Sequence, residues 1–208
     1  MTKIPDEKVP NVFSLESSDD RLSGFTSGSS AQEINNKVVK IKMKDVFLTD
    51  IKRIPPSSVD PTIKNYHWMD LVTGMLDAYE RGHQTAILVD ENNNISEGPG
   101  FNIFSVDKSG INTPDRGILE GITRQTVINL AKELKLKVNT KPISIEMLKS
   151  SDELFATSTA GGVMPITKVS GEKIGSGKVG DNTRKIHKLY WEKHSDLDWT
   201  LSVEDLLK

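Results

Sequence analysis

The sequence predicts an α+β protein with a largely antiparallel sheet, and two features of its periodicity indicate this class. Short apolar runs of about four to eight residues alternate with turn-forming residues, as in strands joined by hairpins. Between them lie longer stretches whose apolar residues recur at the spacing of one helix face. Strands that come in hairpins and are interrupted by helices are typical of the α+β class.

The first part of the chain differs from the rest in composition. Residues 15–36 are rich in Ser, Asp, Glu, Gly and Asn and have few large apolar side chains to offset the entropy lost on ordering. Residues 38–47 then alternate apolar and basic side chains, which predicts a half-buried strand at a sheet edge. We therefore divide the chain into a truncated or loosely ordered N-terminal segment, residues 1–54, and a large domain, residues 55–208.

Beyond Pro61 the predicted elements follow one another closely. Five apolar residues at helical spacing predict a helix that ends at Gly82: Trp68, Leu71, Val72, Met75 and Tyr79. Two further helices are expected, one after Thr123 and one around residues 186–190. The predicted strands are residues 85–89, 95–97, 101–106, 154–158 and 163–169, with a short one after the turn at 107–110.

Composition excludes several classes of function. The chain of 208 residues contains no cysteine, which excludes disulfides, thiolate nucleophiles and cysteine-ligated metals. Its net charge of -2 argues against nucleic acid or an anionic membrane as the main partner. No apolar run approaches the roughly 20 residues of a membrane span, and the four histidines lack the spacing of metal ligands. We expect a cytoplasmic protein without a metal site.

Two ionisable residues are candidates for chemistry. Most lysines are solvated surface charges, but Lys64 stands among bulky apolar and aromatic residues at a predicted strand-to-helix junction. Partial desolvation there would disfavour the ammonium form, as Schiff-base chemistry requires. Glu97 precedes Gly98-Pro99-Gly100, which lets the backbone turn sharply and approach a ligand closely. If buried, its carboxylate needs a cationic partner.

Two segments are suited to an anion such as phosphate. Gly121-Ile122-Thr123 opens the best amphipathic helix of the chain, with Thr123 expected at the N-cap and free amides converging with the helix dipole. Thr157-Ser158-Thr159, followed by Ala160-Gly161-Gly162, adds hydroxyls and exposed amides, although taken alone it is also an ordinary polar loop.

A third glycine-containing segment is interpreted differently. Residues 175–180 (GSGKVG) match the glycine spacing of a dinucleotide fingerprint and precede a helix. No long parallel strand leads into them, however, and too few residues follow to supply the helix and the next strand with its acidic residue. We interpret this segment as a glycine-rich turn.

Taken together and in order, five motifs resemble those of class IV aminotransferases, the branched-chain and D-amino-acid aminotransferase family. They are DPTIKNYHW at 60–68, ISEGPGFNIF at 95–104, TP at 113–114 with LEGITR at 119–124, DELF at 152–155 with TAGG at 159–162, and Gly180 with TRK at 183–185. The resemblance runs from about residue 55 to residue 194. Within the family, the NYHW string and AGG at 160–162 are most similar to R-selective amine transaminases.

The resemblance implies a pyridoxal 5'-phosphate cofactor bound in a large domain of this fold. Lys64 would carry the cofactor as a Schiff base and move a proton between substrate and cofactor. Glu97 would pair with the pyridine nitrogen and keep it protonated, which makes the ring an electron sink. Leu119 would pack on the face of the ring.

The resemblance also implies which residues hold the phosphate and the substrate. The amides of Ile122 and Thr123, which follow Gly121, would bind the phosphate together with Thr159. Trp68, Ala160 and Gly161 would line the substrate pocket. The expected partners are an amino donor and a 2-oxo acid acceptor.

The chain departs from the family in its N-terminal part. Family members carry a small N-terminal domain that is longer than the segment preceding Lys64 here, and their active site lies between the two domains. That domain usually supplies an arginine to the cofactor phosphate. Arg21 is not assigned to this role, and Arg53 belongs to the linker. We therefore expect weak cofactor binding, self-association into a homodimer or larger assembly, and little turnover by this chain alone.

The expected activity is transfer of an amino group between an amino acid or amine and a 2-oxo acid. Two alternatives stay open. The first is a lyase of the same fold, similar to the aminodeoxychorismate lyases, which would release pyruvate. The second is a cofactor-binding or partner-binding domain without turnover.

Overall fold

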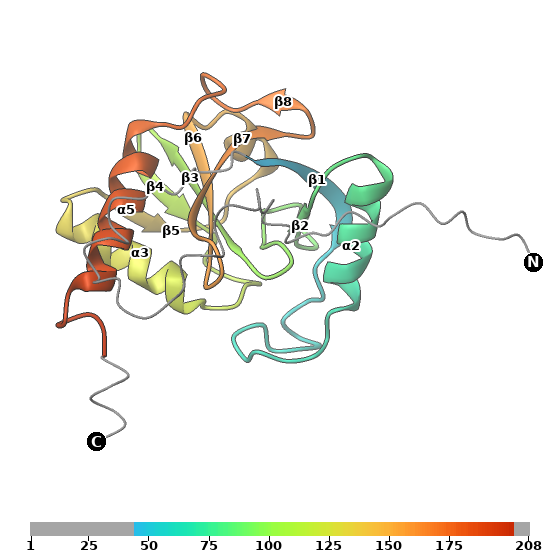
Figure 1. Ribbon diagram of the computed structural model, residues 1–208. Coiled ribbons are helices and arrows are strands. Elements are labelled where there is room, and N and C mark those ends of the chain that lie inside the picture. The colour runs from blue at the N-terminus through green and yellow to red at the C-terminus, as the bar shows by residue number, and fades with distance from the viewer. Residues whose placement is uncertain (1–43, 202–208) are drawn as a thin grey trace, which may run out of the picture. The chain divides into compact units, whose positions relative to one another are not determined.

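Eight strands form a mixed sheet in the computed structural model, which describes residues 44–201 (Figure 1). In chain order the strands are β1 (Lys44–Lys52), β2 (Ala86–Val89), β3 (Asn102–Asp107), β4 (Gly110–Thr113), β5 (Val138–Thr140), β6 (Glu153–Ser158), β7 (Gly162–Val169) and β8 (Glu172–Lys173). Their spatial order is β2-β1-β7-β6-β3-β4-β5, and β8 pairs with β7. The pairs β3–β4, β3–β6, β6–β7 and β7–β8 are antiparallel, whereas β1–β2, β1–β7 and β4–β5 are parallel.

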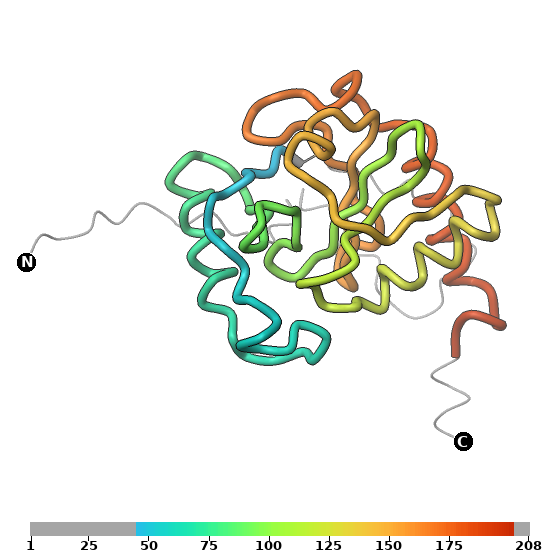
Figure 2. The backbone as a smooth tube through the Cα atoms, turned by 180° about the vertical axis from the view of Figure 1, so that it is seen from behind, coloured from blue at the N-terminus to red at the C-terminus, as the bar shows by residue number. Residues whose placement is uncertain are grey.

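Helices flank this sheet in two groups. The helices are α2 (Met69–Glu80), α3 (Ile122–Glu133), α4 (Ile145–Lys149) and α5 (Asp181–Glu192), followed by a 3-10 turn at Lys193–Ser195. Helices α3 and α5 pack against each other and against β6, while α2 packs against β1 and β2 (Figures 1 and 2). Strands and segregated helices of this kind confirm the predicted α+β class.

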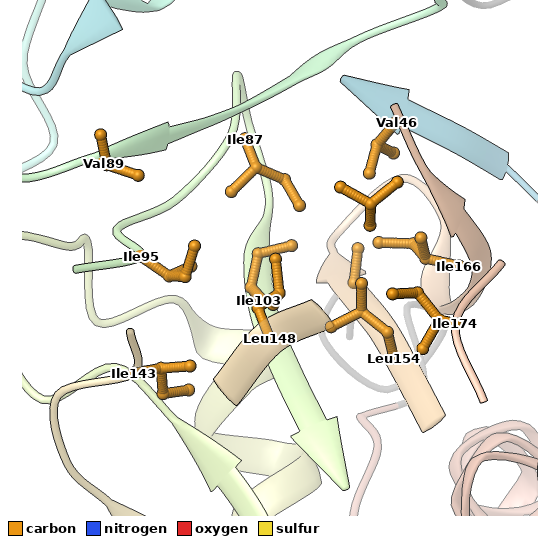
Figure 3. Packing of buried hydrophobic residues seen from close by; sticks show 12 residues of the cluster. Val46, Ile87, Val89, Ile95, Ile103, Ile143, Leu148, Leu154, Ile166 and Ile174 are labelled. Carbon is orange, nitrogen blue, oxygen red and sulfur yellow. The ribbon is translucent and has the colours of Figure 1, made fainter. Parts of the chain in front are cut away.

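Three clusters of buried apolar side chains form the core of the described part of the chain, and the smallest joins α2 to β2 through Leu71, Ala78, Ala86 and Leu88. In the first, Val46 of β1, Ile87 of β2 and Ile166 of β7 point toward one another, and α4 adds Leu148 (Figure 3). The second lies under α3 and α5. Its centre is the cross-strand pair Phe104–Phe155, whose rings stack with centroids 4.9 Å apart. Successive residues of a strand point to opposite faces, so Ile103 of β3 joins the first cluster and Phe104 the second.

Strand β1 differs from its prediction in position and in surroundings. It pairs on both sides, through Phe47 with Ala86 of β2 and through Val46 with Val169 of β7. The expectation of an edge strand is therefore wrong, and residues 38–43 of the predicted strand lie outside the described residues. Because β1 precedes residue 55 and is hydrogen bonded into the sheet, the folded part of the chain includes residues that the sequence assigned to the N-terminal segment.

The predicted hairpin at residues 85–97 is present, although its second arm is not a regular strand. Val89 and Ile95 form an isolated antiparallel bridge. Ser96 N–H donates to the Leu88 carbonyl at 2.9 Å, and Leu88 N–H donates to the Glu97 carbonyl at 3.0 Å. These bonds fix the backbone of Glu97 beside β2 and so aim its side chain away from the turn.

Strands β5 and β8 and helix α4 were not predicted, and one helix end is capped by a distant side chain. Strand β5 and helix α4 are too short to show a periodicity, although Ser144 caps α4 by accepting from Met147 N–H at 3.2 Å. At α5, Glu153 Oε1 accepts from Asn182 N–H at 3.1 Å. Its Oε2 accepts from Thr183 N–H at 2.8 Å. No helix within residues 44–201 has the length and apolar character that crossing a membrane requires.

Candidate active site

Four segments that are distant in sequence surround a pocket of about 290 Å³. They are the stretch from Arg53 to Leu71, the turn at residues 97–102, the start of α3 with the residues before it, and the end of β6. Eight of the ten site residues named from the sequence line it: Lys64, Trp68, Glu97, Leu119, Gly121, Ile122, Thr123 and Thr159. Ala160 and Gly161 are not among the lining residues, and they continue the turn directly after Thr159.

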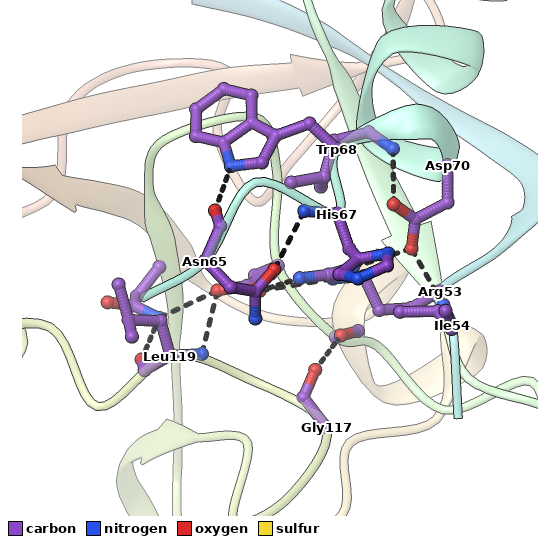
Figure 4. Close-up of polar contacts among 12 residues, drawn as sticks. Arg53, Ile54, Asn65, His67, Trp68, Asp70, Gly117 and Leu119 are labelled. Carbon is purple, nitrogen blue, oxygen red and sulfur yellow. Dashed lines mark hydrogen bonds and ion pairs between the residues drawn. The ribbon is translucent and has the colours of Figure 1, made fainter. Parts of the chain in front are cut away.

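The loop that carries Lys64 is held by hydrogen bonds of its own side chains. Asp60 accepts from the backbone N–H of Thr62 at 2.9 Å and from its hydroxyl at 2.6 Å. Asn65 donates to the Ile63 carbonyl at 2.8 Å, and its backbone carbonyl accepts from Trp68 Nε1 at 3.0 Å (Figure 4). Such local side-chain-to-backbone bonds favour a turn over helix or strand. The loop therefore presents Lys64 in a defined conformation without help from a neighbouring element.

The surroundings of Lys64 are more open than the sequence indicates. Lys64 is exposed, and the bulky neighbours that were expected to desolvate it are exposed as well: Ile63 to 63%, Tyr66 to 102% and Trp68 to 41%. The predicted strand-to-helix junction is correct, but the predicted desolvation is wrong for the described residues. These apolar side chains are left largely uncovered, although Ile63 and Trp68 also line the pocket.

Glu97 is buried in the pocket floor, and both of its carboxylate oxygens accept hydrogen bonds from the protein. Oε1 accepts from Arg53 Nε and Nη2, both at 3.1 Å. Oε2 accepts from Leu119 N–H at 3.0 Å and makes a longer contact of 3.5 Å with the side-chain amide of Asn102. Burial raises the pKa of Glu97 above its ordinary value; the Leu119 N–H and Arg53 lower it, and the charge of Asp70 raises it slightly. The cationic partner expected from the sequence is therefore present within the protein itself.

Arg53 is part of the pocket and not of a linker, which corrects the interpretation drawn from the sequence. It is buried, and besides Glu97 it binds Asp70 in α2, with Nη1 2.5 Å from Asp70 Oδ2. Figure 4 shows its side chain beside Asp70. No local pattern marks Arg53 in the sequence, because its partners lie 17 and 44 residues further along the chain. Asp70 has one signal, an acidic residue in the first turn of a predicted helix.

The segment before α3 is tied to Glu97 through backbone groups. The side chain of Asn102 donates to the Leu119 carbonyl at 2.8 Å, and the Leu119 N–H is the donor to Glu97. A Cβ at position 121 would lie 2.4 Å from the Asn102 side-chain oxygen, so glycine is required there. Buried Arg124 holds the start of the same segment by donating to the Pro114 carbonyl at 2.9 Å. Leu119 is thus placed at the pocket wall by its two backbone bonds, to Asn102 and to Glu97, which the sequence did not reveal.

Helix α3 begins at the pocket without a capping side chain. Its N-cap is Gly121, and within residues 44–201 no side chain accepts from its first amides. Thr123 is the second helical residue and is buried, so the expectation that it would be the N-cap is wrong. The first amides of a helix lack intrahelical acceptors and lie at the positive end of the helix dipole. Because residues 121–123 line the pocket, these amides are available to an anion within it.

The end of β6 adds hydroxyl groups on the same side of the pocket. Thr157 is 1% exposed, and its Oγ1 has no hydrogen-bond partner among the described residues. A buried hydroxyl without a partner costs about 1–3 kcal/mol, so a bound ligand or water is expected to satisfy it. Ser158 accepts from Gly161 N–H at 3.0 Å, which shapes the turn, and Thr159 is exposed at the pocket rim.

The sequence profile of the family described as amino-transferase class IV matches residues 15–169. The chain belongs to this family. The branched-chain-amino-acid aminotransferase of Escherichia coli K12 is 34% identical over 152 residues, which are 71% of this chain and 48% of that protein. The chain thus spans about half the length of the curated relatives that it matches.

Solved structures of the same family share the fold. The branched-chain amino acid aminotransferase of Thermobaculum terrenum, solved in its PLP form, matches with a TM-score of 0.73 and 28% identity, over 77% of this chain and 54% of that one. The branched-chain aminotransferase of Thermoproteus uzoniensis, solved with norvaline, matches with a TM-score of 0.71 and 28% identity, over 77% of this chain and 55% of that one. The predicted class IV fold is therefore confirmed.

Proposed function

We propose that this chain is the cofactor-binding part of a pyridoxal-phosphate-dependent aminotransferase that acts on an amino acid or amine and a 2-oxo acid. The observation that carries the proposal is the convergence of Lys64, Glu97 and the uncapped start of α3 on one pocket. The amine suits the aldehyde of the cofactor, and the buried carboxylate suits its pyridine nitrogen. The helix N-terminus suits its phosphate ester.

The residues present fit this cofactor by their chemistry. Lys64 is the single lysine among the described residues that line the pocket. Glu97 shares one guanidinium with Asp70, which leaves the buried group of three with one more negative than positive charge and room for a ligand cation. The phosphate would find the free amides after Gly121 and the hydroxyl of Thr159, with the unpartnered Thr157 close behind.

Each residue then has a chemical task. When bound, the cofactor supplies an electron sink for the negative charge that develops on the substrate carbon bearing the amino group. Lys64 Nζ would hold the cofactor and, once released, accept and return the proton that moves during transfer. Glu97 would keep the ring nitrogen protonated by a charge-assisted hydrogen bond. Leu119 would fix the ring plane, because its backbone is held by Glu97 and Asn102.

The substrate class follows from the relatives and from the pocket lining. The matched relatives are named branched-chain-amino-acid aminotransferases. Trp68, Phe101 and Ile122 give the pocket an apolar wall that suits an aliphatic side chain. We therefore propose a branched-chain or similar apolar substrate. The likeness to R-selective amine transaminases, the domain boundary at residue 55, the homodimer and the cytoplasmic location stay predictions.

Borohydride reduction of the full chain incubated with pyridoxal 5'-phosphate tests the proposal. Reduction should fix one cofactor per chain on Lys64, as peptide mass spectrometry would show, and Lys64→Ala should abolish the adduct. An adduct mainly on another lysine would refute the assignment. Transfer from leucine to a 2-oxo acid should then be assayed with and without added partner polypeptides. Pyruvate release instead of transfer would favour the lyase, and attachment without either reaction would favour the binding domain.

A further inference from the structure

Asp70 occupies a position in the site that none of these tasks explains. It is the second residue of α2, a few residues after the loop that presents Lys64. Its Oδ2 accepts from Arg53 Nη1 at 2.5 Å and from the Ile54 backbone N–H at 2.7 Å. The side chains of Arg53 and Asp70 are 9% and 13% exposed, so water screens this ion pair little.

The geometry divides one guanidinium between two carboxylates. Arg53 gives Nη1 to Asp70, while Nε and Nη2 both go to Oε1 of Glu97. Oε2 of Glu97 accepts from the Leu119 N–H at 3.0 Å, and its second contact, with the Asn102 amide at 3.5 Å, is long enough for a closer donor to replace it. A buried group of two anions and one cation is costly unless another cation joins it.

We propose that Asp70 is a positioning residue that keeps Arg53 from neutralising Glu97 and so reserves Oε2 of Glu97 for a protonated ring nitrogen. This inference rests on the proposed function and deepens it. Without Asp70, the guanidinium would be left with Glu97 as its one anionic partner, and the attraction of the pocket floor for a ligand cation would fall. Asp70 would act on the ligand through charge alone, since it does not line the pocket.

A purely structural role of Asp70 would lead to a different result. Asp70 also ties the end of β1 to the start of α2 through Ile54. If that anchor were its whole role, removing the charge would weaken every ligand of the pocket alike. The ring nitrogen distinguishes the two roles, because two ligands that share aldehyde and phosphate and differ in this one charge respond alike to every other effect of Asp70.

The test measures ligand dissociation constants of the full chain with two matched ligands. One is pyridoxal 5'-phosphate, and the other is its 1-deaza analogue, in which carbon replaces the ring nitrogen while aldehyde and phosphate stay. Asp70→Asn should weaken the binding of pyridoxal 5'-phosphate about three- to tenfold. This is the effect expected when the lost charge of Asp70, which acts through Arg53, shifts the pKa of the ring nitrogen by roughly half to one unit. Affinity for the deaza analogue should stay unchanged.

Three further variants complete the design. Asp77→Asn is the matched control, because Asp77 lies on the same helix and bonds Thr49 and Arg81 but not Arg53. It should change neither affinity. Asp70→Glu restores the charge and should recover most of the loss. In a Glu97→Gln background, Asp70→Asn should have little further effect, because the two acid side chains act on the same ligand atom.

The outcomes separate this inference from the proposed function. Equal weakening of both ligands by Asp70→Asn, or no weakening of either, would overturn the role of Asp70 while the wild-type chain still binds pyridoxal 5'-phosphate at Lys64. A wild-type chain that binds neither ligand would overturn the proposed function and this inference together.

Discussion

Two helices of this protein begin directly after a glycine, and their N-termini differ in what they leave free. At α5, which follows Gly180, Glu153 fills the helix end by accepting from the backbone of Asn182 and Thr183 and from the Thr183 hydroxyl. At α3, which follows Gly121, no side chain of the described residues caps the helix, and the first residues line a pocket. The surroundings of a helix end, and not the glycines before it, decide whether an anion can bind there.

The two glycines are required for a similar steric reason, so the glycines do not account for the difference between the two helix ends. A Cβ at Gly180 would lie 2.0 Å from the carboxyl carbon of Glu153, and a Cβ at Gly121 would lie 2.4 Å from the side-chain oxygen of Asn102. In both places a polar side chain comes close to the backbone. At α5 it is a carboxylate bound to helix amides. At α3 it is an amide that donates to Leu119 and leaves the helix end open.

The largest effect is expected when the internal cap of α5 is removed. Glu153→Ala leaves four donor groups of Asn182 and Thr183 without their acceptor. The free energy of unfolding, measured by urea denaturation, should fall by about 2–3 kcal/mol. Glu120→Ala is the control, because Glu120 is an exposed glutamate just before α3, and it should cost less than about 0.5 kcal/mol. Equal losses in both variants would mean that Glu153 is not a cap.

A smaller effect of opposite sign is expected at Glu97. Its pKa is raised in the folded chain, mainly by burial, so the folded state favours the protonated form. Its contribution to stability is therefore full below the ordinary glutamate pKa of about 4.3 and is lost as the pH rises through the raised value. Glutamine does not ionise, so the Glu97→Gln variant should not lose stability in this way as the pH rises. Without ligand it should be at least as stable as the parent at pH 8.

Urea denaturation between pH 4 and pH 8 checks this expectation as the difference between parent and variant. Subtracting the two curves cancels the titrating groups that do not interact with Glu97. A Gln variant that is less stable than the parent at pH 8 would contradict it, and would indicate that the Arg53–Glu97 attraction outweighs the cost of burial. Glu97 and Glu153 would then be alike in stabilising the fold.

The sequence predicts a structural feature of this protein well when the residues that cause it lie close together in the chain. Helix α2 ends as predicted, because apolar spacing and Gly82, with its φ of 79°, both act within a few residues. The edge position of β1 was predicted wrongly, since its partners β2 and β7 are distant in sequence and no alternation pattern identifies them. Parallel pairing is set by the packing of whole elements and leaves no mark on the strand itself.

The same distinction applies to the pocket. The residues named from motifs converge, because a shared fold places shared motifs together. Their individual roles are not tested by that convergence. Arg53 was missed because a single arginine before two prolines has no local meaning, and its burial results from contacts with Asp70 and Glu97. The desolvation of Lys64 was predicted from apolar neighbours, but neighbours in sequence need not pack on one another, and Ile63 and Tyr66 face outward.

The smallest effect concerns the anion itself. Inorganic phosphate, which lacks the ring and the aldehyde, should bind weakly at the open end of α3. At a concentration a few times its dissociation constant it should raise the free energy of unfolding by roughly 1 kcal/mol, relative to chloride of equal ionic strength. Thr123→Val keeps the size of a buried side chain but removes its hydroxyl, so it should reduce this gain.

Lys178→Ala is the matched control for Thr123→Val. Lys178 is exposed in the glycine-rich turn before α5, where a nucleotide-binding interpretation of the sequence would place a phosphate contact. The turn has another explanation for its glycines, since Gly175 and Gly177 adopt φ of 51° and 71°. With Glu153 already bound to the α5 amides, a second anion there would meet a like charge. Removing Lys178 should therefore leave the phosphate gain intact. Loss of the gain in this variant, with no change in Thr123→Val, would place the anion at α5 and reverse the comparison.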